Sequence, residues 1–467
     1  MITMKFGGTS MGDAQRILAV ARIVQDTWQK GEKTVVVVSA MSGVTDSLIE
    51  AATSASRRDG ERFRRIKEQL LARHQTVVQE LLQEGERQDA LMRELKGLLD
   101  GFGDLCQSIY ILGELTARGL DAVSSLGERL SARILASLLS RKGANSIPVD
   151  GTSLIVTNDH HGQANPLLGQ TREKVRAQLL PLLETGVIPV VTGFIGATAE
   201  GITTTLGRGG SDYTAAIVGN CLDSDEICIW SDVDGVMTAD PKVVKEAKTL
   251  AEVSYAEMAE LSYFGAKVLH PKTIIPAMEK GIPLRIRNTF KPQHPGTLVV
   301  GEAIQTERAV KSIACIKRMS LVTVEGRGMV GVPGVAAKVF SAVAREGISV
   351  AMISQSSSER NICFVIPQEA TPQALKALEE EFAQELSRRN IDRIWAQGDV
   401  AIVAVVGAGM RGTPGIAAKV FGALGRHGIN IICIAQGSSE YNISCVIDEK
   451  DADDAVNYIH QEFGLGE

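Results

Sequence analysis

The sequence predicts an α/β fold in which a mostly parallel sheet lies between two layers of helices, followed by two copies of a small α+β domain. Two observations support this prediction. Short apolar runs rich in β-branched residues, such as Thr34–Val38, alternate with helical patterns over roughly 300 residues. In the last third of the chain, stretches of sequence recur at a fixed spacing, which is typical of a duplicated domain.

The composition is that of an ordinary globular protein. The 467 residues are 44% hydrophobic and 22% charged, with a net charge of −6, so nothing favours binding to nucleic acid or to an anionic membrane. No apolar run approaches the ~20 residues of a membrane span, and the first strand begins at once, so we expect no signal peptide and a cytoplasmic location. The seven cysteines and seven histidines are scattered, which predicts free thiols and no protein-bound metal.

The N-terminal segment predicts a strand, a tight loop and a helix. Lys5 ends a short apolar run, two glycines and two hydroxyl residues follow over 7–10, and a helical pattern begins at Asp13. The loop matches neither the Walker A spacing nor Gly-x-Gly-x-x-Gly, which argues against a dinucleotide site. A lysine at a strand end beside a glycine loop can neutralise phosphoryl oxygens during transfer.

Residues 46–105 predict two or three exposed amphipathic helices, and a more apolar helical pattern continues from 106 to 145. Their charges are interpreted as solvated faces. Within this part, Glu128 follows Gly127 and is either a surface acid or a carboxylate for a substrate ammonium. Further strands are expected over 146–149, 154–156 and 187–192. Ser39 and Thr45 follow the strand Thr34–Val38, where ligands of such sheets bind, although lone hydroxyls more often form turns.

The stretch 203–212 is the strongest local candidate for an anion site. Arg208 lies among three glycines, and Ser211 and Asp212 precede a helical run over 213–218. Glycines let backbone N–H groups approach a ligand, and a helix N-terminus and an arginine fork both suit a carboxylate or phosphate. Ser or Asp before a helix also predicts an N-cap. The alternative is an ordinary glycine turn with a solvated arginine.

The end of the α/β segment predicts a strand over 227–230, a helix over 259–271 that Pro271 ends, and a last strand over 283–287. Asp232 and Asp234 follow the first of these strands, where they could hold a magnesium nucleotide or cap the next turn. Beyond this segment, residues 332–340 recur at 413–421 and residues 354–362 recur at 435–443, both 81 residues later. Each copy predicts strand, Gly-Pro loop, helix, strand, hairpin, strand and helix. A pair of such copies can hold a small ligand at its interface or be a purely structural duplication.

Together these motifs resemble the aspartate kinases, a branch of the amino-acid kinase family with two C-terminal ACT domains. The matching stretches are residues 5–10, 38–41, 127–128, 207–212, 232–235, 240–241 and 267–271. The resemblance covers nearly the whole chain. It implies a three-layer αβα kinase domain over 1–303, ferredoxin-like ACT domains over 304–396 and 397–467, and no homoserine dehydrogenase domain of the kind that some relatives carry.

The resemblance implies that ATP phosphorylates L-aspartate to 4-phospho-L-aspartate, with Mg²⁺ accompanying ATP. The acceptor carboxylate is already ionised at pH 7, so catalysis should rest on positioning and charge neutralisation. The implied catalytic residues are Lys5 and Asp212. The implied aspartate contacts are Ser39, Thr45, Glu128 for the α-ammonium, Phe194, Arg208 for the α-carboxylate, and Ser211. The implied ATP contacts are Lys5, Gly7, Gly8, Ser10, Gly209, Gly210, Ser231, Asp232, Met237 (often aromatic in relatives), Lys242 and Lys267.

The resemblance also implies feedback control by an amino acid and assembly into a homodimer or homotetramer. Lysine-sensitive relatives place an acid where this chain has Ala351, whereas threonine-sensitive relatives use glutamines that match Gln355 and Gln436. A neutral amide pocket suits a hydroxyl better than an ammonium, so threonine is favoured over lysine. The implied effector contacts are Met329, Gly334, Val335, Ser349, Val350, Ala351, Gln355, Asn361, Gln436 and Asn442. The alternatives are a sibling kinase with a glutamate-type acceptor and a sensor that has lost catalysis.

Overall fold

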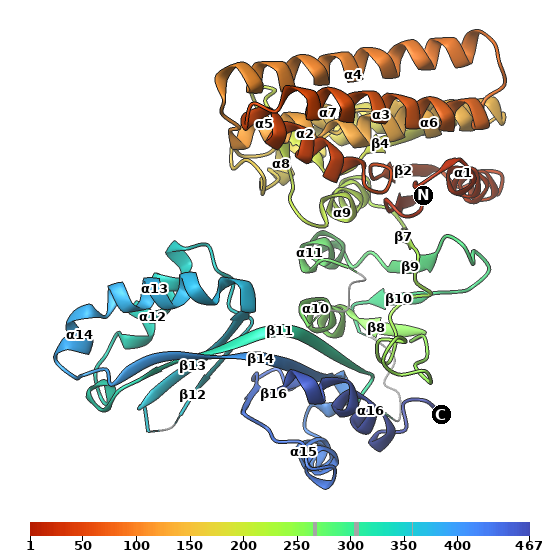
Figure 1. Ribbon diagram of the computed structural model, residues 1–467. Helices are drawn as coiled ribbons and strands as arrows, with labels where there is room; N and C mark the ends of the chain where they lie inside the picture. The colour runs from red at the N-terminus through yellow and green to blue at the C-terminus, as the bar shows by residue number, and fades with distance from the viewer. Residues whose placement is uncertain (265–268, 303–307, 357) are drawn as a thin grey trace. The chain divides into compact units, whose positions relative to one another are not determined.

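The computed structural model describes residues 1–264, 269–302, 308–356 and 358–467, and it divides into two compact units. The first unit comprises Met1–Val236, Ala251–Met258 and Lys267–Ala303, and the second comprises Met237–Leu250, Ala259–Ala266 and Ile304–Glu467. Figure 1 labels most of the elements of both. The division at residues 303 and 396 that the sequence suggests stays a prediction.

The first unit is built on an eight-stranded sheet in the order β3-β4-β2-β1-β7-β9-β10-β8. All neighbouring strands run parallel except β9 and β10, which confirms the predicted mostly parallel sheet. The strands are β1 (Ile2–Phe6), β2 (Thr34–Val38), β3 (Ser146–Val149), β4 (Ile188–Thr192), β7 (Glu226–Ser231), β8 (Glu252–Ser254), β9 (Leu284–Asn288) and β10 (Thr297–Val300). Because β10 follows β9 in the chain, the expectation that the strand at 283–287 is the last of this unit is wrong.

The side chains of β1 point alternately to the two faces of the sheet, and each face is covered by a layer of helices. Met4 and Phe6 belong to the core cluster that contains residues of α1 (Ala14–Trp28) and α6 (Leu126–Arg141). Successive side chains of a strand point to opposite faces, so Lys5 points the other way. That other face is covered by α9 (Gly210–Leu222), which packs against α8 (Leu168–Glu184) and α11 (Pro271–Lys280).

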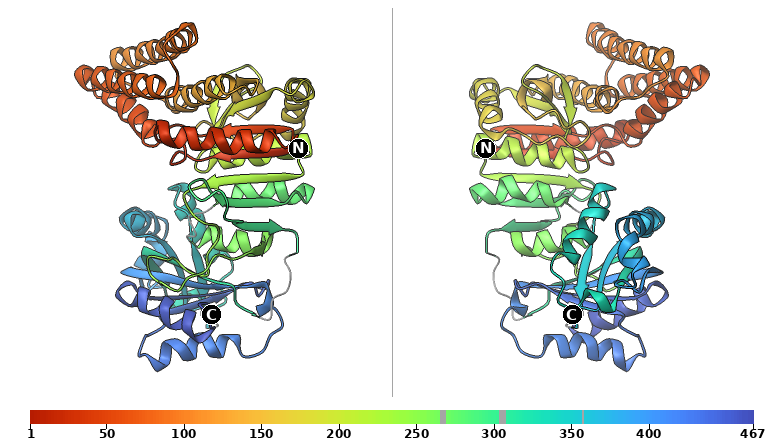
Figure 2. Two further views of the ribbon diagram at one scale, coloured as in Figure 1. Left: turned by 90° about the vertical axis from the view of Figure 1, so that its right-hand side faces the viewer. Right: turned by 90° about the vertical axis from the view of Figure 1, so that its left-hand side faces the viewer.

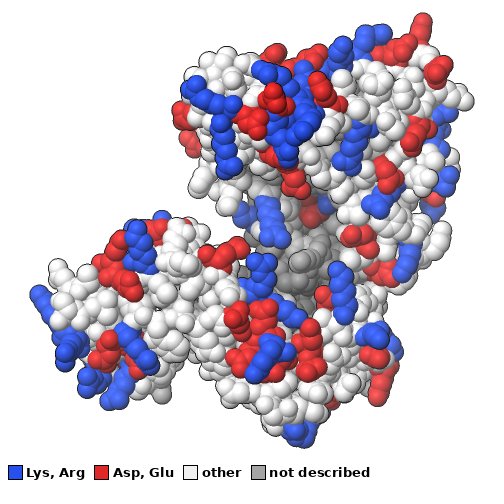
Figure 3. Space-filling model, in the orientation of Figure 1, with Lys and Arg blue, Asp and Glu red and all other residues white. Residues whose placement is uncertain are grey.

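The insertion predicted to be helical forms three long helices, α2 (Val44–Ser56), α3 (Gly60–Leu81) and α4 (Glu86–Leu112), followed by the short α5 (Ala117–Ser124). Their apolar residues continue the core of α1 and α6. Figure 2 shows the group as an orange and red bundle beside the sheet. On the face seen in Figure 3, basic and acidic side chains are mixed over these helices, as expected for a solvated surface.

Three local predictions are wrong for identifiable physical reasons. Residues 154–156 are not a strand, because Asp150 caps the single helical turn α7 (Gly151–Leu154) and only isolated bridges at Val156 and Thr157 follow. Pro271 begins α11 rather than ending a helix, since proline fits the first helical position. The preceding helix, α10 (Tyr255–Tyr263), ends earlier, and residues 265–268 of the predicted helix lie outside the described residues.

The N-terminus of α9 also differs from its prediction. Its N-cap is Gly209, with φ 73° and no side-chain capping bond, while Ser211 and Asp212 lie within the first turn. The two side chains are therefore not used as caps. Before α9, the chain forms a small hairpin of β5 (Ile195–Ala197) and β6 (Thr203–Thr205).

The second unit contains both copies of the repeat in one antiparallel sheet with the order β12-β13-β11-β14-β16-β15. The first copy supplies β11 (Ser312–Glu325), α12 (Val335–Arg345), β12 (Met352–Gln355), β13 (Asn361–Pro367) and α13 (Thr371–Glu381), with the short α14 (Ala383–Ser387) after it. The second supplies β14 (Arg393–Val406), α15 (Ile416–Arg426), β15 (Cys433–Gln436), β16 (Asn442–Asp448) and α16 (Ala452–Glu462). The predicted element order is confirmed in both copies. Each copy has its own hydrophobic core between its strands and helices, and Ala239 and Val244 join the core of the second.

All seven cysteines are free thiols, as predicted. Over the part of the chain that the structure describes, no helix is both long and apolar enough to cross a membrane.

Candidate active site

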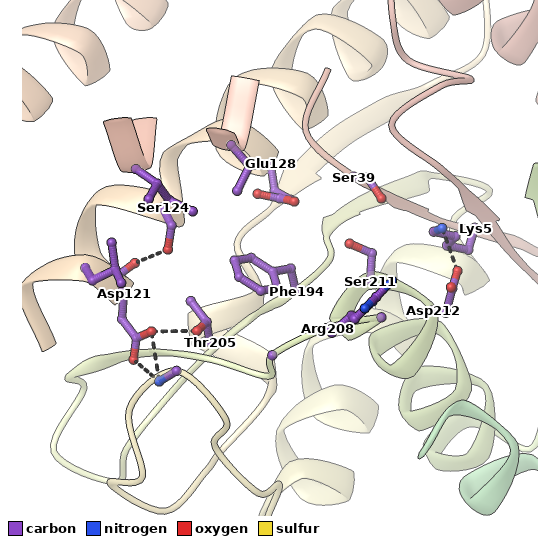
Figure 4. Close-up of a pocket in the computed structure, with 17 residues that line it drawn as sticks. Lys5, Ser39, Asp121, Ser124, Glu128, Phe194, Thr205, Arg208, Ser211 and Asp212 are labelled. Atoms are coloured by element: carbon purple, nitrogen blue, oxygen red, sulfur yellow. Dashed lines mark hydrogen bonds and ion pairs between the residues drawn. The ribbon is translucent and has the colours of Figure 1, made fainter. Parts of the chain in front are cut away.

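A cavity of about 430 Å³ lies within the first unit and collects the polar residues that the sequence motifs single out. Every predicted catalytic and aspartate-binding residue lines it, together with two predicted ATP contacts besides Lys5. The residues are Lys5, Ser39, Thr45, Glu128, Phe194, Arg208, Gly209, Gly210, Ser211 and Asp212. Figure 4 shows how most of these side chains are arranged. The cavity also has lining residues that were not predicted: Ile49, Leu120, Asp121, Ser124, Gly162, Thr205 and Gly207.

Lys5 and Asp212 form an ion pair at one end of this cavity. Lys5 points from β1 to the face covered by α9, and Asp212 lies in the first turn of that helix. Lys5 Nζ is 2.5 Å from Asp212 Oδ1, and the two side chains are 10% and 15% exposed. A partly buried ammonium held in this way can neutralise charge on a transferring phosphoryl group.

Glu128 is a buried carboxylate that forms no ion pair with any described residue. It lies at the start of α6, where Gly127 allows close packing, because a Cβ there would lie 2.5 Å from Cβ of Ala40. Oε1 of Glu128 accepts a hydrogen bond from the backbone N–H of Ala40 at 3.1 Å, whereas Oε2 is buried without a hydrogen-bond partner among the described residues. Burial raises the pKa of Glu128 to about 8. A bound cation would satisfy Oε2 and restore the charged form.

Arg208 is a cationic side chain that lines the same cavity as Glu128. It lies in the loop between β6 and α9, is exposed and lines the cavity. Within the described ranges its side chain has no hydrogen bond or ion pair, so its fork is available to an anion. The flanking Gly207 and Gly209 have φ of 77° and 73°, and a Cβ on Gly209 would lie 2.5 Å from Cβ of His270.

Phe194 lines the cavity and has an unusual backbone conformation. Its φ of 70° lies in the left-handed region that non-glycine residues rarely adopt. The conformation is held because the N–H of Phe194 donates to Oγ1 of Thr214 at 3.0 Å. The neighbouring Gly193 leaves no room for a side chain, since a Cβ there would lie 2.7 Å from Cβ of Ser211. Strain of this kind is typical of functional sites.

Asp121 is the functional candidate that sequence reasoning missed most clearly. It is 2% exposed, lines the cavity and holds hydrogen bonds from Thr205 and from residues 161–162. No local motif marks it, because these partners lie about 40 and 84 positions away in the sequence. Of these residues only Thr205 lies within the glycine–arginine stretch 203–212, so the sequence could have indicated Thr205 but not Asp121.

Five of the predicted ATP contacts lie at the carboxyl ends of two neighbouring strands, β1 and β7, beside the end of β9. The loop after β1 carries Gly7, Gly8 and Ser10, and the hydroxyls of Ser10 and Thr289 are 2.7 Å apart. Ser231 ends β7, and Asp232 follows it and is exposed. The strand ends adjoin, since the N–H of Gly7 donates to the carbonyl of Trp230 at 3.2 Å and that of Thr289 to Ser231 at 2.9 Å.

Three further predicted ATP contacts are not tested by this arrangement. Met237 and Lys242 belong to the second unit, and Lys267 lies outside the described residues. All three assignments stay predictions.

The described residues contain no group of three or more His, Cys, Asp or Glu side chains that could hold a metal ion. Magnesium that arrives with a nucleotide needs only one or two carboxylates in addition to phosphate oxygens. Asp212 fits such a role, because it lines the cavity beside the phosphoryl-binding candidate Lys5.

The candidate effector residues lie in the second unit, and four of them line a smaller cavity of about 270 Å³ in the first copy of the repeat. Met329, Gly334, Val335 and Gln355 line it. Ser349, Val350 and Ala351 precede β12, and Asn361 begins β13. In the second copy, Gln436 ends β15 and Asn442 begins β16. Their roles stay predictions.

Comparison with known proteins agrees with both halves of this architecture. The model of the amino acid kinase family matches residues 1–288, and the ACT domain model matches residues 322–382 and 403–463. The chain is 39% identical over 99% of its length to the chloroplastic bifunctional aspartokinase/homoserine dehydrogenase 2 of Zea mays, of which it covers 50%. It is 32% identical to the lysine-sensitive aspartokinase 3 of Escherichia coli, with 98% of each chain covered.

A solved structure extends the likeness to three dimensions. Aspartokinase III of Escherichia coli in complex with aspartate and ADP superposes with a TM-score of 0.81 at 30% identity, with 99% of each chain covered. The fold is that of an amino acid kinase family α/β domain followed by two ACT domains. The chain belongs to the amino acid kinase family, and its full-length relatives within that family are aspartokinases. It spans about half the length of the bifunctional plant relatives that it matches.

Proposed function

We propose that this protein is an aspartate kinase, which transfers the γ-phosphoryl group of ATP to the side-chain carboxylate of L-aspartate. The observation that supports it best is the set of charges around one cavity. Among the described residues, the buried carboxylate of Glu128 forms no ion pair and the guanidinium of Arg208 meets no anion, while Lys5 lies beside Asp212. An α-amino acid supplies one ammonium and one carboxylate, so it would complement the first two groups.

The chemistry needs little from the protein beyond placement and charge. The acceptor carboxylate is already a nucleophile at neutral pH, so no side chain has to remove a proton from it. Lys5 would neutralise oxygens of the transferring group, and Asp212 would orient Lys5 or the nucleotide's metal. Mg²⁺ held by the ATP phosphates would add positive charge at the same place.

The acceptor is tested by measuring ADP release with Mg·ATP and L-aspartate, L-glutamate, N-acetyl-L-glutamate or a nucleoside monophosphate. We expect turnover with aspartate at the highest kcat/KM. Turnover with another acceptor but not with aspartate would favour a sibling kinase and contradict the pairing of Glu128 and Arg208 with an α-amino acid. Binding of an amino acid without turnover of any acceptor would favour a sensor.

We further propose that an amino acid binds the second unit as a feedback inhibitor and that threonine is favoured over lysine. The support is chemical: Ala351 brings no charge, and Gln355 presents an amide at the cavity of the first repeat. Adding each amino acid at millimolar concentration to the ADP assay tests this. Inhibition by lysine with no response to threonine would contradict it.

Assembly as a homodimer or homotetramer and a cytoplasmic location stay predictions.

A further inference from the structure

One buried carboxylate joins two segments of chain that border the candidate active site. Asp121 lies on α5, and its Oδ1 accepts a hydrogen bond from Oγ1 of Thr205 at 2.5 Å. Its Oδ2 is 2.7 Å from Nδ1 of His161, and the backbone N–H of Gly162 is 3.1 Å from both oxygens. Figure 4 shows the contacts with Thr205 and with the N–H group at the edge of the cavity.

The two segments held by Asp121 also contact each other beside Arg208. Thr205 ends β6, three residues before Arg208, and its carbonyl accepts a hydrogen bond from the N–H of Ala164 at 2.9 Å. Gly207 packs on the same loop, because a Cβ there would lie 3.1 Å from the carbonyl oxygen of Gly162. The backbone leading to Arg208 is thus fixed by Asp121 directly and through the loop 158–165.

Asp121 is unsuited to bind substrate directly. Both of its oxygens already accept hydrogen bonds from the protein, whereas Oε2 of Glu128 accepts none from the described residues. A substrate ammonium therefore fits Glu128, and a purely supporting role fits Asp121.

We propose that Asp121 is a positioning residue that fixes the loop 207–209 and so places the Arg208 guanidinium for the α-carboxylate of the acceptor. This inference rests on the proposed function, because it requires an acceptor with such a carboxylate. Arg208 is exposed and has no side-chain partner in the described part of the chain, so its position depends on its backbone. Catalytic groups need a rigid supporting shell to be placed accurately.

The first test replaces Asp121 by Asn, which keeps the size of the side chain but turns one acceptor oxygen into a donor facing other donors. We expect the KM for aspartate to rise about tenfold or more, while the KM for ATP changes less than about twofold. Thr205→Val removes a single hydrogen bond and should raise the same KM, whereas Thr205→Ser should leave it unchanged. Asp150→Asn is the matched control, since Asp150, like Asp121, accepts from a threonine hydroxyl and a backbone N–H, but it pairs with Arg129 and does not line the cavity.

A double-mutant cycle distinguishes action through Arg208 from general damage. In an Arg208→Ala background, Asp121→Asn should change the KM for aspartate by less than about twofold, because the group that it positions is gone. An equal factor in both backgrounds, or an equal rise in the KM for ATP, would overturn the inference.

Hydrogen exchange provides a readout that needs no turnover. Amides of residues 206–210 should exchange faster in Asp121→Asn than in the unaltered chain, and those of α8 should not. Unchanged exchange at 206–210 would overturn the positioning role even if the unaltered chain failed to phosphorylate aspartate. That failure by itself would contradict only the proposed function.

Discussion

The backbone N–H of Ala40 donates a hydrogen bond to Oε1 of Glu128 at 3.1 Å, and this is the contact that holds the carboxylate at the cavity. Ala40 follows β2 and Glu128 opens α6, so the loop and the helix orient the carboxylate together. With Oε1 occupied, Oε2 is the atom left to meet a substrate ammonium.

Glu128→Gln should weaken aspartate binding with little effect on ATP. The amide keeps the size of the side chain but removes the charge that would pair with an ammonium. We expect the KM for aspartate to rise at least about tenfold, since hydrogen bonds to charged groups contribute roughly 1.5–3 kcal/mol. Steady-state kinetics with each substrate varied in turn measure this. An unchanged KM for aspartate would exclude Glu128 as the ammonium ligand.

Aspartate binding should strengthen as pH rises towards 8. Burial raises the pKa of Glu128 to about 8, so the free protein holds a neutral carboxyl at pH 7, and only the charged form pairs with an ammonium. The logarithm of kcat/KM for aspartate should therefore climb between about pH 6 and 8 and then level off. In Glu128→Gln that climb should disappear. A flat profile in the unaltered chain would contradict the assignment.

The same group should make the free protein less stable at higher pH. Between about pH 4.5, the ordinary pKa of the carboxyl, and about pH 8, the native state keeps a proton that the unfolded state has lost. Unfolding then releases a proton, so its free energy falls as pH rises through this window. Denaturant unfolding at several pH values should show this fall in the unaltered chain and a smaller one in Glu128→Gln. Equal slopes in both would indicate another titrating group.

Arg208→Lys should raise the KM for aspartate although it keeps the charge. A lysine lacks the planar fork that binds a carboxylate through two hydrogen bonds, so we expect a rise of about tenfold. Because Arg208 has no side-chain partner among the described residues, the free energy of unfolding should change by less than about 0.5 kcal/mol. A large loss of stability would show that this arginine has a structural role instead.

Gly209→Ala should impair both folding and turnover through a steric clash. Gly209 has φ 73°, and an added Cβ would lie 2.5 Å from Cβ of His270. Gly201→Ala is the matched control, since Gly201 has φ 82° but nothing lies within 4 Å of the added atom. Both variants carry a backbone cost of about 1–2 kcal/mol, and only Gly209→Ala should also lose kcat/KM for aspartate. Equal loss in both would mean that the contact with His270 is unimportant.

Tyr263→Phe should alter the response to the effector without altering basal turnover. The hydroxyl of Tyr263 donates to the carbonyl of Val350, a predicted effector contact, at 2.7 Å. On the same helix, Oε2 of Glu260 accepts from Asn442, a predicted effector contact of the second repeat, at 3.3 Å. Loss of the hydroxyl should shift the half-inhibiting effector concentration by about threefold or more. Tyr458→Phe, which keeps its ring stacked on His427, should not.

The strands, the loop around Arg208 and the repeated domain could be predicted from the sequence, because each has a recognisable local pattern. Runs such as Thr34–Val38 became buried parallel strands because their lack of polar positions suits a sheet covered on both sides. The loop around Arg208 was evident from its glycines, and the repeat at its 81-residue spacing predicted two copies of a small α+β domain. Glu128 was ambiguous until it was compared with a known family, since a lone acid after a glycine is usually a surface residue.

The remainder depended on contacts that no local pattern records. Asp121 became important only because folding brings Thr205 and His161 to it from distant positions. The error at Pro271 arose because proline was interpreted only as a helix terminator, although His270 before it accepts from the N–H of Lys272 and caps a new helix. Local sequence patterns were therefore enough to predict the strands and loops, but not the residues such as Asp121 that hold the site in place through distant contacts.

Identification of the reaction product tests the central claim most directly. The protein is incubated with Mg·ATP, L-aspartate and hydroxylamine, which converts an acyl phosphate to a stable hydroxamate. We predict aspartate β-hydroxamate in a one-to-one ratio with ADP, and none with Lys5→Ala, which lacks the ammonium beside Asp212. ADP without hydroxamate, or neither product from the unaltered chain, would contradict phosphoryl transfer to the carboxylate of aspartate.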